Sequence, residues 1–482
     1  MSASLKGFQK EALLGIFKTM ATSRRTDEKM LTLLRQGKSF FHIGASGHEG
    51  AQLACAMQMN SDLDWSYPYY RDQTLVMGLG MTTEELFLSF LAKADDPGSG
   101  GRQLPQHYGQ KKLNIVSQSS PTGTQFLQAV GTAMAARRTN KKALVYVSSG
   151  EGTTSQGEFH EALNWAGREK LPVLFHIEDN GFAISVPKSS QTAEGSVYDM
   201  VGGYGNLNRF ETDGTDFFES YATFKAAIES IRAGKGPAIV VSNVVRLLPH
   251  SSSDDHRKYR DAEELSEEQK RDPIEKFRAQ CEQAGIISSE EFQQILDEVL
   301  VEVDEAAEKA LTAPFPERGD AATHVVDDSF VSIPSSEPTK TGSEIVIVDA
   351  INHALHEEMR RNDAMIIYGQ DVADGKGGVF TATKGLSTEF GDQRVFNSPL
   401  AEASIVGTAV GAAIAGLKPV VEIQFGDYIW TAMMQIRNEV ATIRYRSNNS
   451  FSCGMVIRTP VGGYIHGGLC HSQSIEGFFM HL

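Results

Sequence analysis

The sequence predicts an α/β protein made of two doubly wound modules, each built around a parallel sheet. Short apolar runs alternate with helical stretches, most clearly from Ala143 to Ser185, and this alternation is typical of strand-helix-strand units. A chain of 482 residues is too long for a single core. A stretch rich in Pro, Ser, Thr and Asp, from Thr312 to Gly342, separates two alternating regions and lacks periodicity, so we interpret it as a linker.

The composition excludes several classes of protein. The formal net charge of -16 is unfavourable for nucleic-acid binding, because phosphate contacts need a basic face. No apolar run is long enough to span a bilayer, and no charged-then-apolar leader opens the chain. The four cysteines lack metal-ligand spacing and suit a reducing compartment. We therefore expect a cytoplasmic protein that has neither nucleic acid nor membrane among its partners.

The stretch from Leu5 to Gly37 is expected to form a helix on the outside of the first module. Its apolar residues recur at helical spacing and define one face: Phe8, Leu13, Phe17 and Met20. A glycine-rich turn then feeds a second helix. This turn carries His42 and His48, which are either contacts for a substrate or cofactor or residues that cap and pack the turn.

An arginine follows the aromatic cluster between Asp64 and Gln73. The guanidinium of Arg71 offers the paired donors that clamp a diphosphate, although an ion pair is the commoner role of a lone arginine. Two polar loops, Gly101 to Gly109 and Ser117 to Gln125, come next and precede a helix from Phe126 to Arg138. Hydroxyl groups before a helix are more often caps than ligands.

Polar residues follow two strands of the first module. The strand from Ala143 to Val147 leads into Gly150-Glu151-Gly152, and the strand from Pro172 to Ile177 ends in Asp179-Asn180-Gly181. A helix from Gly157 to Glu169 connects them. Ligands bind beyond the carboxyl ends of parallel strands, so Glu151, Asn180 and the backbone near Phe182 are candidates to surround a hard cation. The glycines let the backbone approach a phosphate, which implies a magnesium diphosphate; the alternative is an ordinary turn.

The rest of the first module contains a third strand and a helical tail. The strand from Ala238 to Val245 leads into a serine-rich, charged segment that ends at Arg260. Such a segment without periodicity is ordinarily a mobile surface loop. A strongly charged pair of helices from Ser266 to Leu311 follows. We expect this pair to pack on the outside of the module with its acidic faces in solvent.

The second module begins at Ser343 and repeats the alternation. It shows a helix from Ile347 to Arg361, a strand from Ala364 to Gly369, a short strand from Arg394 to Phe396 and a small-residue helix from Val406 to Ala415. Glu402 lies just before this apolar helix. A carboxyl group in that setting is costly unless it has a partner and a task, although a helix cap is the alternative.

Several strings resemble the decarboxylating first component of the branched-chain 2-oxo acid dehydrogenase complex. The string GEGTTSQGEFHEALNWA, which begins at Gly150, is similar to its α subunit, and NSPLAEASIVG, which begins at Asn397, is similar to its β subunit. The wider thiamine diphosphate signature has Asp where Glu151 stands. The resemblance implies a thiamine diphosphate-binding fold in a fused chain, with an α-like domain over 1–311, a linker over 312–342 and a β-like domain over 343–482. It also leads us to expect further β-subunit sequence beyond Leu482.

The resemblance implies roles for individual residues. The diphosphate-binding residues would be Tyr70, Arg71, Gly150, Gly152 and Thr153. The aminopyrimidine ring would contact the backbone of Ser120 and Thr122 and the side chains of Glu402, Leu400, Gln424 and Tyr428. Mg²⁺ would be held by Glu151, Asn180 and Phe182, and a structural K⁺ by Ser119, Thr124 and Gln125.

The same resemblance implies three catalytic residues, and this sequence departs from the family pattern at three positions. Glu402, which would favour the imino tautomer of the ring, is joined as a catalytic residue by His250 and His471. Ser251 stands where relatives can be phosphorylated. The departures are Thr122, where the family usually has Leu, Glu178, where it often has a diphosphate-binding Arg, and Gln156, which replaces an acid.

The implied function is thiamine diphosphate-dependent oxidative decarboxylation of a 2-oxo acid, with acyl transfer to the lipoyl group of a partner acyltransferase. The strings IQFGDYIW and GRQLPQHYG favour a branched-chain 2-oxo acid, as in branched-chain amino acid catabolism, over pyruvate. A homodimer or larger assembly is expected, because the two halves of such sites commonly come from different chains. The alternatives are an acetoin-dehydrogenase-like or transketolase-like thiamine enzyme, and a catalytically inactive scaffold subunit.

Overall fold

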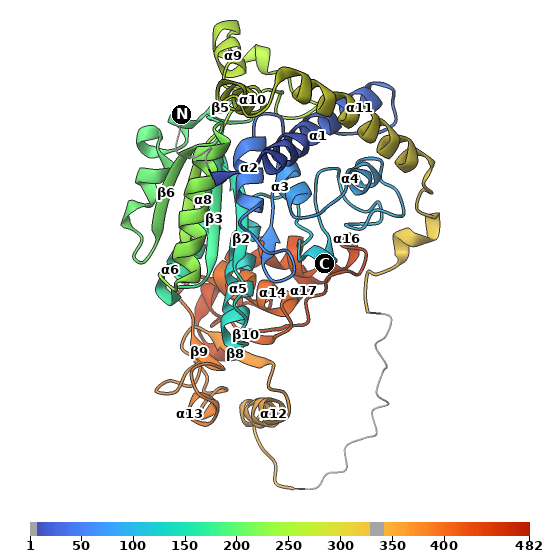
Figure 1. The fold of residues 1–482 in the computed structure, drawn as a ribbon. Helices are drawn as coiled ribbons and strands as arrows, with labels where there is room; N and C mark the ends of the chain where they lie inside the picture. Colours follow the sequence, from blue (N-terminus) through green and yellow to red (C-terminus); the bar gives the residue numbers. More distant parts are fainter. Residues whose placement is uncertain (1–6, 328–341) are drawn as a thin grey trace.

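The computed structural model describes residues 7–327 and 342–482, so part of the predicted linker lies outside the described residues. Two parallel sheets form the frame of the molecule (Figure 1). The first has the order β1-β2-β3-β7-β6, with strands Trp65–Tyr67, Val145–Gly150, Val173–Asp179, Ala238–Asn243 and Asn208–Asp213. The second has the order β11-β10-β8-β9, with strands Val456–Arg458, Lys418–Glu422, Met365–Gly369 and Val395–Asn397. The predicted α/β class with two parallel sheets is confirmed.

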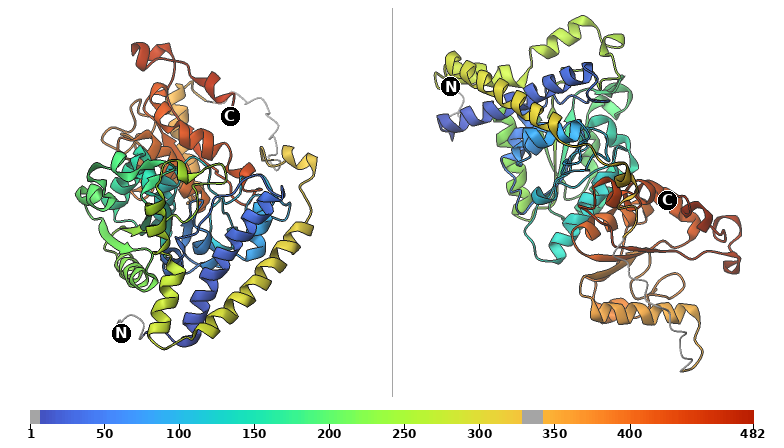
Figure 2. Two further views of the ribbon diagram at one scale, coloured as in Figure 1. Left: turned by 90° about the horizontal axis from the view of Figure 1, so that it is seen from above. Right: turned by 90° about the vertical axis from the view of Figure 1, so that its right-hand side faces the viewer.

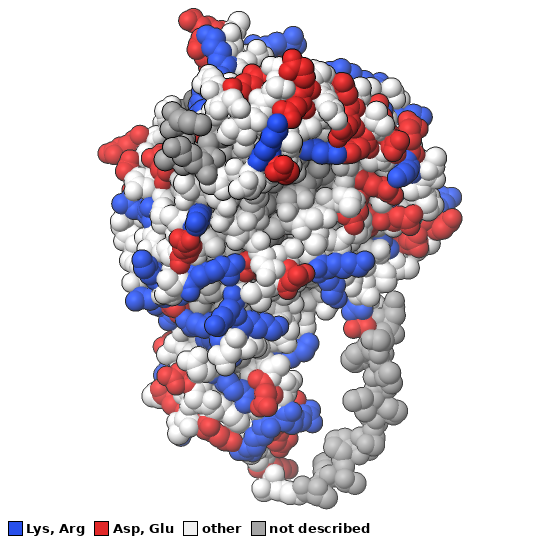
Figure 3. All heavy atoms as spheres, viewed as in Figure 1, with Lys and Arg blue, Asp and Glu red and all other residues white. Residues whose placement is uncertain are grey.

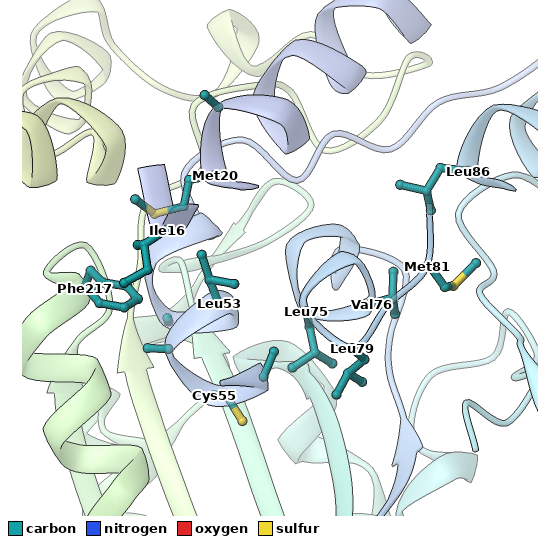
Figure 4. Packing of buried hydrophobic residues seen from close by; sticks show 14 of the residues in the cluster. Ile16, Met20, Leu53, Cys55, Leu75, Val76, Leu79, Met81, Leu86 and Phe217 are labelled. Carbon is teal, nitrogen blue, oxygen red and sulfur yellow. The ribbon is translucent and has the colours of Figure 1, made fainter. Parts of the chain in front are cut away.

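Helices cover both faces of the first sheet because its strands are apolar on both sides. On one face, Leu144, Tyr146 and Leu174 pack into a core with α1 (Lys10–Arg35), α2 (Glu49–Ala56) and α8 (Phe217–Arg232). Figure 4 shows part of this core, including Ile16 and Met20 of α1, Leu53 of α2 and Phe217 of α8. On the other face, Val145, Val147 and Val173 pack with α5 (Thr124–Arg138) and α6 (Gly157–Glu169).

The acidic tail forms three helices instead of the predicted pair: α9 (Ala262–Gln269), α10 (Pro273–Gln283) and α11 (Ser289–Thr312). Asp272 caps α10 ahead of a proline, and Ser288 caps α11 with a capping box. A new helix therefore begins at each of these two residues. α11 lies beside α1 (Figure 2), where Lys10–Glu291 and Lys18–Glu302 ion pairs of 2.6 Å join them. Acidic side chains gather over α11 in Figure 3, as expected for its solvent face.

Shorter elements complete the described chain. The remaining helices are α3 (Gln73–Gly78), α4 (Thr83–Phe90), α7 (Val197–Met200), α12 (Ile347–Arg361), α13 (Leu386–Phe390), α14 (Glu402–Ile414), α15 (Met433–Gln435), α16 (Ile443–Arg446) and α17 (Glu476–Phe479). A two-stranded antiparallel pair joins β4 (Phe182–Ala183) to β5 (Val186–Pro187). Over residues 7–327 and 342–482, no helix is both long enough and apolar enough to cross a membrane.

The two modules touch through small residues on α5 and α14. A Cβ atom added at Gly131 would lie 1.9 Å from the carbonyl oxygen of Thr408, and one added at Gly411 would lie 1.8 Å from that of Gln128. The Thr132 hydroxyl donates to the carbonyl of Gly411 over 3.0 Å. One hydrophobic core therefore continues from the α5 side of the first sheet to Ile366 and Val421 in the second.

We expect Gly411→Ala to lower the free energy of unfolding by about 2 kcal/mol, because the added methyl group overpacks this contact. Gly15→Ala is the matched control, since Gly15 lies in the exposed part of α1 with no atom within 4 Å of the added Cβ. Denaturant unfolding of both variants measures the difference. Equal stability of Gly411→Ala and the wild type would mean that the helices can separate without cost.

Candidate functional site

A cavity of about 340 Å³ opens at the carboxyl ends of β2 and β3. Its lining includes every first-module residue that the sequence predicted for thiamine diphosphate or Mg²⁺ binding, together with the predicted catalytic histidine: Tyr70, Arg71, Ser120, Thr122, Gly150, Glu151, Gly152, Thr153, Asn180, Phe182 and His250. Tyr69, Ala183 and Ile184 complete the wall. Residues from five separate stretches of the chain thus converge at the sheet edge where ligands bind in α/β folds.

Strand pairing places two of the predicted Mg²⁺ ligands, Glu151 and Asn180, together. β2 and β3 run parallel with Gly150 opposite Glu178, so the residues that follow each strand emerge side by side. The backbone N–H of Asn180 donates to Glu151 Oε2 over 3.3 Å. The Asn180 side-chain oxygen accepts from the N–H of Phe182 over 3.4 Å, which holds the amide over the turn.

Glu151 is a buried carboxyl group whose loss of solvation is not fully compensated by hydrogen bonds. It is 1% exposed, and its Oε1 has no hydrogen-bond partner within the described part of the chain. Burial, with the nearby charge of Asp179, raises the pKa of Glu151 to about 7. A divalent cation would supply the missing partner and favour the ionised form. The oxygen donors of Glu151 and Asn180 therefore fit a hard cation such as Mg²⁺.

Arg71 holds His250 at the cavity in a defined tautomer. One guanidinium nitrogen donates to the carbonyl of Gly44 over 2.6 Å, and the other donates to His250 Nδ1 and to its carbonyl, each over 3.0 Å. Because arginine can only donate, Nδ1 accepts and the ring proton sits on Nε2. Burial and the charges of Arg71 and Arg246 lower the pKa of His250 to about 4. His250 is therefore neutral near pH 7 and acts as a donor through Nε2.

Arg246 is a functional candidate that the sequence interpretation missed. It is 1% exposed, and its Nε and Nη1 have no partner among the residues that the structure describes. Its Nη2 donates to the carbonyl of Ile184, a cavity residue, over 3.0 Å and to the Tyr259 hydroxyl over 2.8 Å. Arg71 lines the cavity and Arg246 lies behind its wall, and two buried guanidinium groups at this place suit a polyanion such as a diphosphate.

Glu178 points away from the cavity into a buried polar network. Its carboxylate contacts His48 Nδ1 and accepts from Gln52 Nε2, which also donates to the carbonyl of Arg71 over 2.9 Å. Burial raises the pKa of Glu178 to about 7. His42 contacts Asp27 over 3.0 Å. Neither His42 nor His48 lines the cavity, so both fit the second interpretation, in which they pack the turn.

The predicted residues of the second module gather at the edge of the second sheet. Glu402 is the first residue of α14, one turn earlier than the predicted helix, and it is only half-buried. Its carboxylate accepts from Gln370 over 3.1 Å and from the Thr431 hydroxyl over 3.3 Å. Tyr428 shares a 2.7 Å hydrogen bond with His471 Nε2. Gln424 donates to Asp371, and Leu400 is 81% exposed.

None of these second-module residues lines the first cavity. The contacts between the modules near Glu402 run through other side chains. Ser404 donates to Glu161 over 2.6 Å, and Gln435 donates to Glu158 over 3.1 Å and to the carbonyl of Thr124 over 2.9 Å. Within one chain, Glu402 is therefore not part of the cavity of the first module.

The groups predicted to hold K⁺ make hydrogen bonds within the protein. Ser119 donates to Glu439 on the second module, Thr124 to the carbonyl of Pro121, and Gln125 to the carbonyl of Ser148. The K⁺ site remains a prediction.

Glu158 at the contact between the modules gives a prediction for stability against pH. Burial raises its pKa to about 8. The folded chain then binds more protons than the unfolded one between about pH 4.5 and 8, so stability falls as the pH rises through this range. Glu158→Gln removes this loss, and we expect it to be the more stable protein at pH 9 by on the order of 2 kcal/mol. Denaturant unfolding at pH 6 and pH 9 tests this; parallel changes in both proteins would contradict it.

Comparison with known proteins gives a family match for each of the two modules. Residues 17–318 match the dehydrogenase E1 component family, and residues 343–482 match the transketolase pyrimidine binding domain. The chain is 42% identical over 309 residues to the 2-oxoisovalerate dehydrogenase subunit alpha of Bacillus subtilis (strain 168), covering 64% of this chain and 93% of that protein. It is 52% identical over 132 residues to the subunit beta, covering 27% of this chain and 40% of the relative.

A more distant relative extends the comparison. The pyruvate dehydrogenase E1 component subunit alpha of Staphylococcus aureus (strain Mu50 / ATCC 700699) is 30% identical over 301 residues, covering 62% of this chain and 78% of that protein. The family match spans most of the cavity-bearing module, and most of the residues that line the cavity are ones that the resemblance leads us to expect. The chain therefore belongs to the dehydrogenase E1 component family, with an α-like and a β-like region in one polypeptide.

Proposed function

We propose that this protein carries out thiamine diphosphate-dependent oxidative decarboxylation of a branched-chain 2-oxo acid and transfers the acyl group to the lipoyl group of a partner acyltransferase. One observation carries the proposal. The buried, unpartnered oxygen of Glu151 lies beside Asn180 in a cavity that Arg71 lines and whose wall residue Ile184 accepts a hydrogen bond from Arg246. This donor set suits a metal diphosphate, and the relatives named 2-oxoisovalerate dehydrogenase support the substrate class.

Different cavity residues would bind the metal, the diphosphate and the ring of the cofactor. Glu151, Asn180 and the backbone of Phe182 would hold Mg²⁺, and Tyr70, Arg71, Gly150, Gly152 and Thr153 would hold the diphosphate. The ring would lie against Ser120 and Thr122. Ser119, Thr124 and Gln125 would hold K⁺. When bound, the cofactor supplies an electron sink for decarboxylation.

A second copy of the chain would complete the site. Glu402, Leu400, Gln424 and Tyr428 do not line the cavity of their own chain, so we assign them to the ring-binding wall of a partner's cavity. Glu402 would hold the ring proton, and His471, tied to Tyr428, would orient substrate. The neutral His250 would donate from Nε2. The proposed unit is therefore a homodimer or larger.

The domain division and the compartment belong to the same proposal. We assign residues 1–311 to the α-like domain, 312–342 to the linker and 343–482 to the β-like domain. The four free thiols, Cys55, Cys281, Cys453 and Cys470, support a reducing compartment such as the cytoplasm. Because the chain spans 40% of the β relative's length, activity within a complete complex is proposed for the whole protein and not for this chain alone.

Titration calorimetry with thiamine diphosphate and Mg²⁺ tests the proposal directly. The expected result is saturable binding that disappears when the metal is chelated. Release of carbon dioxide with an artificial electron acceptor then ranks a panel of 2-oxo acids, with 2-oxoisovalerate expected ahead of pyruvate. A well-folded protein that binds no thiamine diphosphate would refute the proposal. Binding without turnover would favour the inactive scaffold subunit.

A further inference from the structure

His107 lies beneath the rim of the cavity and contacts one of its lining residues. The side chain is 3% exposed. Its Nδ1 lies 3.1 Å from the carbonyl oxygen of Pro105, and its Nε2 lies 2.8 Å from the hydroxyl oxygen of Ser120. Ser120 lines the cavity and is itself exposed at the mouth. A buried imidazole therefore joins the polar loop at 101–109 to the cavity wall.

The two hydrogen bonds define how the imidazole is protonated. A carbonyl oxygen can only accept, so Nδ1 of His107 carries the proton and donates to Pro105. Nε2 then has a free lone pair, and the Ser120 hydroxyl must donate to it. Burial and the charge of Arg446 lower the pKa of His107, which agrees with a neutral ring. The hydroxyl proton of Ser120 is therefore used in the hydrogen bond to His107.

From this geometry we infer that His107 is a positioning residue that makes the Ser120 hydroxyl a hydrogen-bond acceptor for an amino group of the bound ligand. The inference rests on the proposed function, which places an aminopyrimidine ring against Ser120, and it adds a side-chain contact to the backbone contact that the resemblance implies. Without His107 the exposed hydroxyl rotates freely and presents either its proton or its lone pairs. With His107 only the lone pairs face the cavity, so the ligand does not have to order the hydroxyl on binding.

The loop that carries His107 is anchored independently of the imidazole. Gln103 donates to the carbonyl of Gln118 over 2.7 Å and to the Ser117 hydroxyl over 3.1 Å. Arg102 donates to Asn448 over 2.7 Å and to Thr323 over 2.7 Å. These bonds fix the amino-terminal part of the loop, ahead of His107. The contact from His107 to Ser120 is thus available to act on the cavity wall, and its loss leaves the loop attached.

A double-mutant cycle on the full chain tests the inference. We expect His107→Leu and Ser120→Ala each to raise the Kd for thiamine diphosphate, at fixed Mg²⁺, about fivefold. The double variant should bind no more weakly than either single variant, because His107 acts only through Ser120. His107→Gln, whose amide oxygen can still accept from Ser120, should recover most of the affinity.

Inorganic diphosphate is the control ligand, because it occupies the metal and phosphate contacts without a ring. Its affinity should be equal in all four variants and in the wild type. Additive losses of thiamine diphosphate affinity, an unchanged Kd in His107→Leu, or a parallel loss of inorganic diphosphate binding would each overturn the inference. If His107→Leu does not fold, His107→Gln and Ser120→Ala still decide it, since the inference requires near wild-type binding in the first and weakened binding in the second. A wild type that binds inorganic diphosphate but not thiamine diphosphate would instead refute the proposed function.

Discussion

Replacing Glu151 with alanine is expected to remove the metal-dependent part of thiamine diphosphate binding and to raise the Kd by on the order of 100-fold or more. Glu151 supplies the charged oxygen of the proposed metal site, and that oxygen is buried without a partner in the described structure. Its loss leaves only the neutral oxygens of Asn180 and the Phe182 backbone, which hold a strongly hydrated cation poorly. Titration calorimetry at fixed Mg²⁺, repeated with a chelator, measures the effect.

Two further variants separate charge from position. Glu151→Gln keeps the size of the side chain but removes its charge, so it should bind as weakly as the alanine variant. Glu194→Ala removes an exposed acid from a nearby loop and should bind like the wild type. If Glu151→Ala still binds thiamine diphosphate in a metal-dependent way within a few-fold of the wild type, the metal lies elsewhere and the assigned cavity is wrong.

Part of the first-module cavity could be predicted from the sequence by local rules, whereas the roles of Arg71, Ser120 and His250 came from the family resemblance. Glu151 and Asn180 each follow an apolar strand, and parallel strands deliver such residues to one edge of the sheet. The same rule applies to Arg246, which follows β7 by three residues. The prediction that α6 spans Gly157 to Glu169 is confirmed at both ends.

Other features depend on contacts between distant parts of the chain. Glu178 lies at the end of β3, and the alternation of a strand predicts the face of the sheet from which its side chain points. It does not predict that His48 on the turn and Gln52 on α2 contact that side chain. The acceptor role of Ser120 depends on His107, which is thirteen residues earlier in a loop without periodicity. Which chain completes a site is set by assembly, so no pattern along one sequence reveals that Glu402 lies away from its own cavity.

Glu402→Gln is expected to lower kcat for decarboxylation by on the order of 1000-fold while the Kd for thiamine diphosphate changes only a few-fold. Glutamine keeps the length and the hydrogen-bonding reach of the side chain, so the contacts with Gln370 and Thr431 can persist. It cannot hold or release a proton at the ring. Carbon dioxide release with an artificial electron acceptor gives kcat, and calorimetry gives the Kd on the same protein.

Glu357→Gln is the matched control, because it makes the same chemical change at an exposed position on α12 of the same module. Its kcat should equal that of the wild type. The two measurements on Glu402→Gln then discriminate between roles for this half-buried carboxylate. A fall in kcat at constant Kd assigns proton transfer to Glu402, whereas equal losses of kcat and affinity would make it a binding residue. An unchanged kcat would remove Glu402 from the chemistry, and with it the reason for placing a second copy of the chain against the cavity.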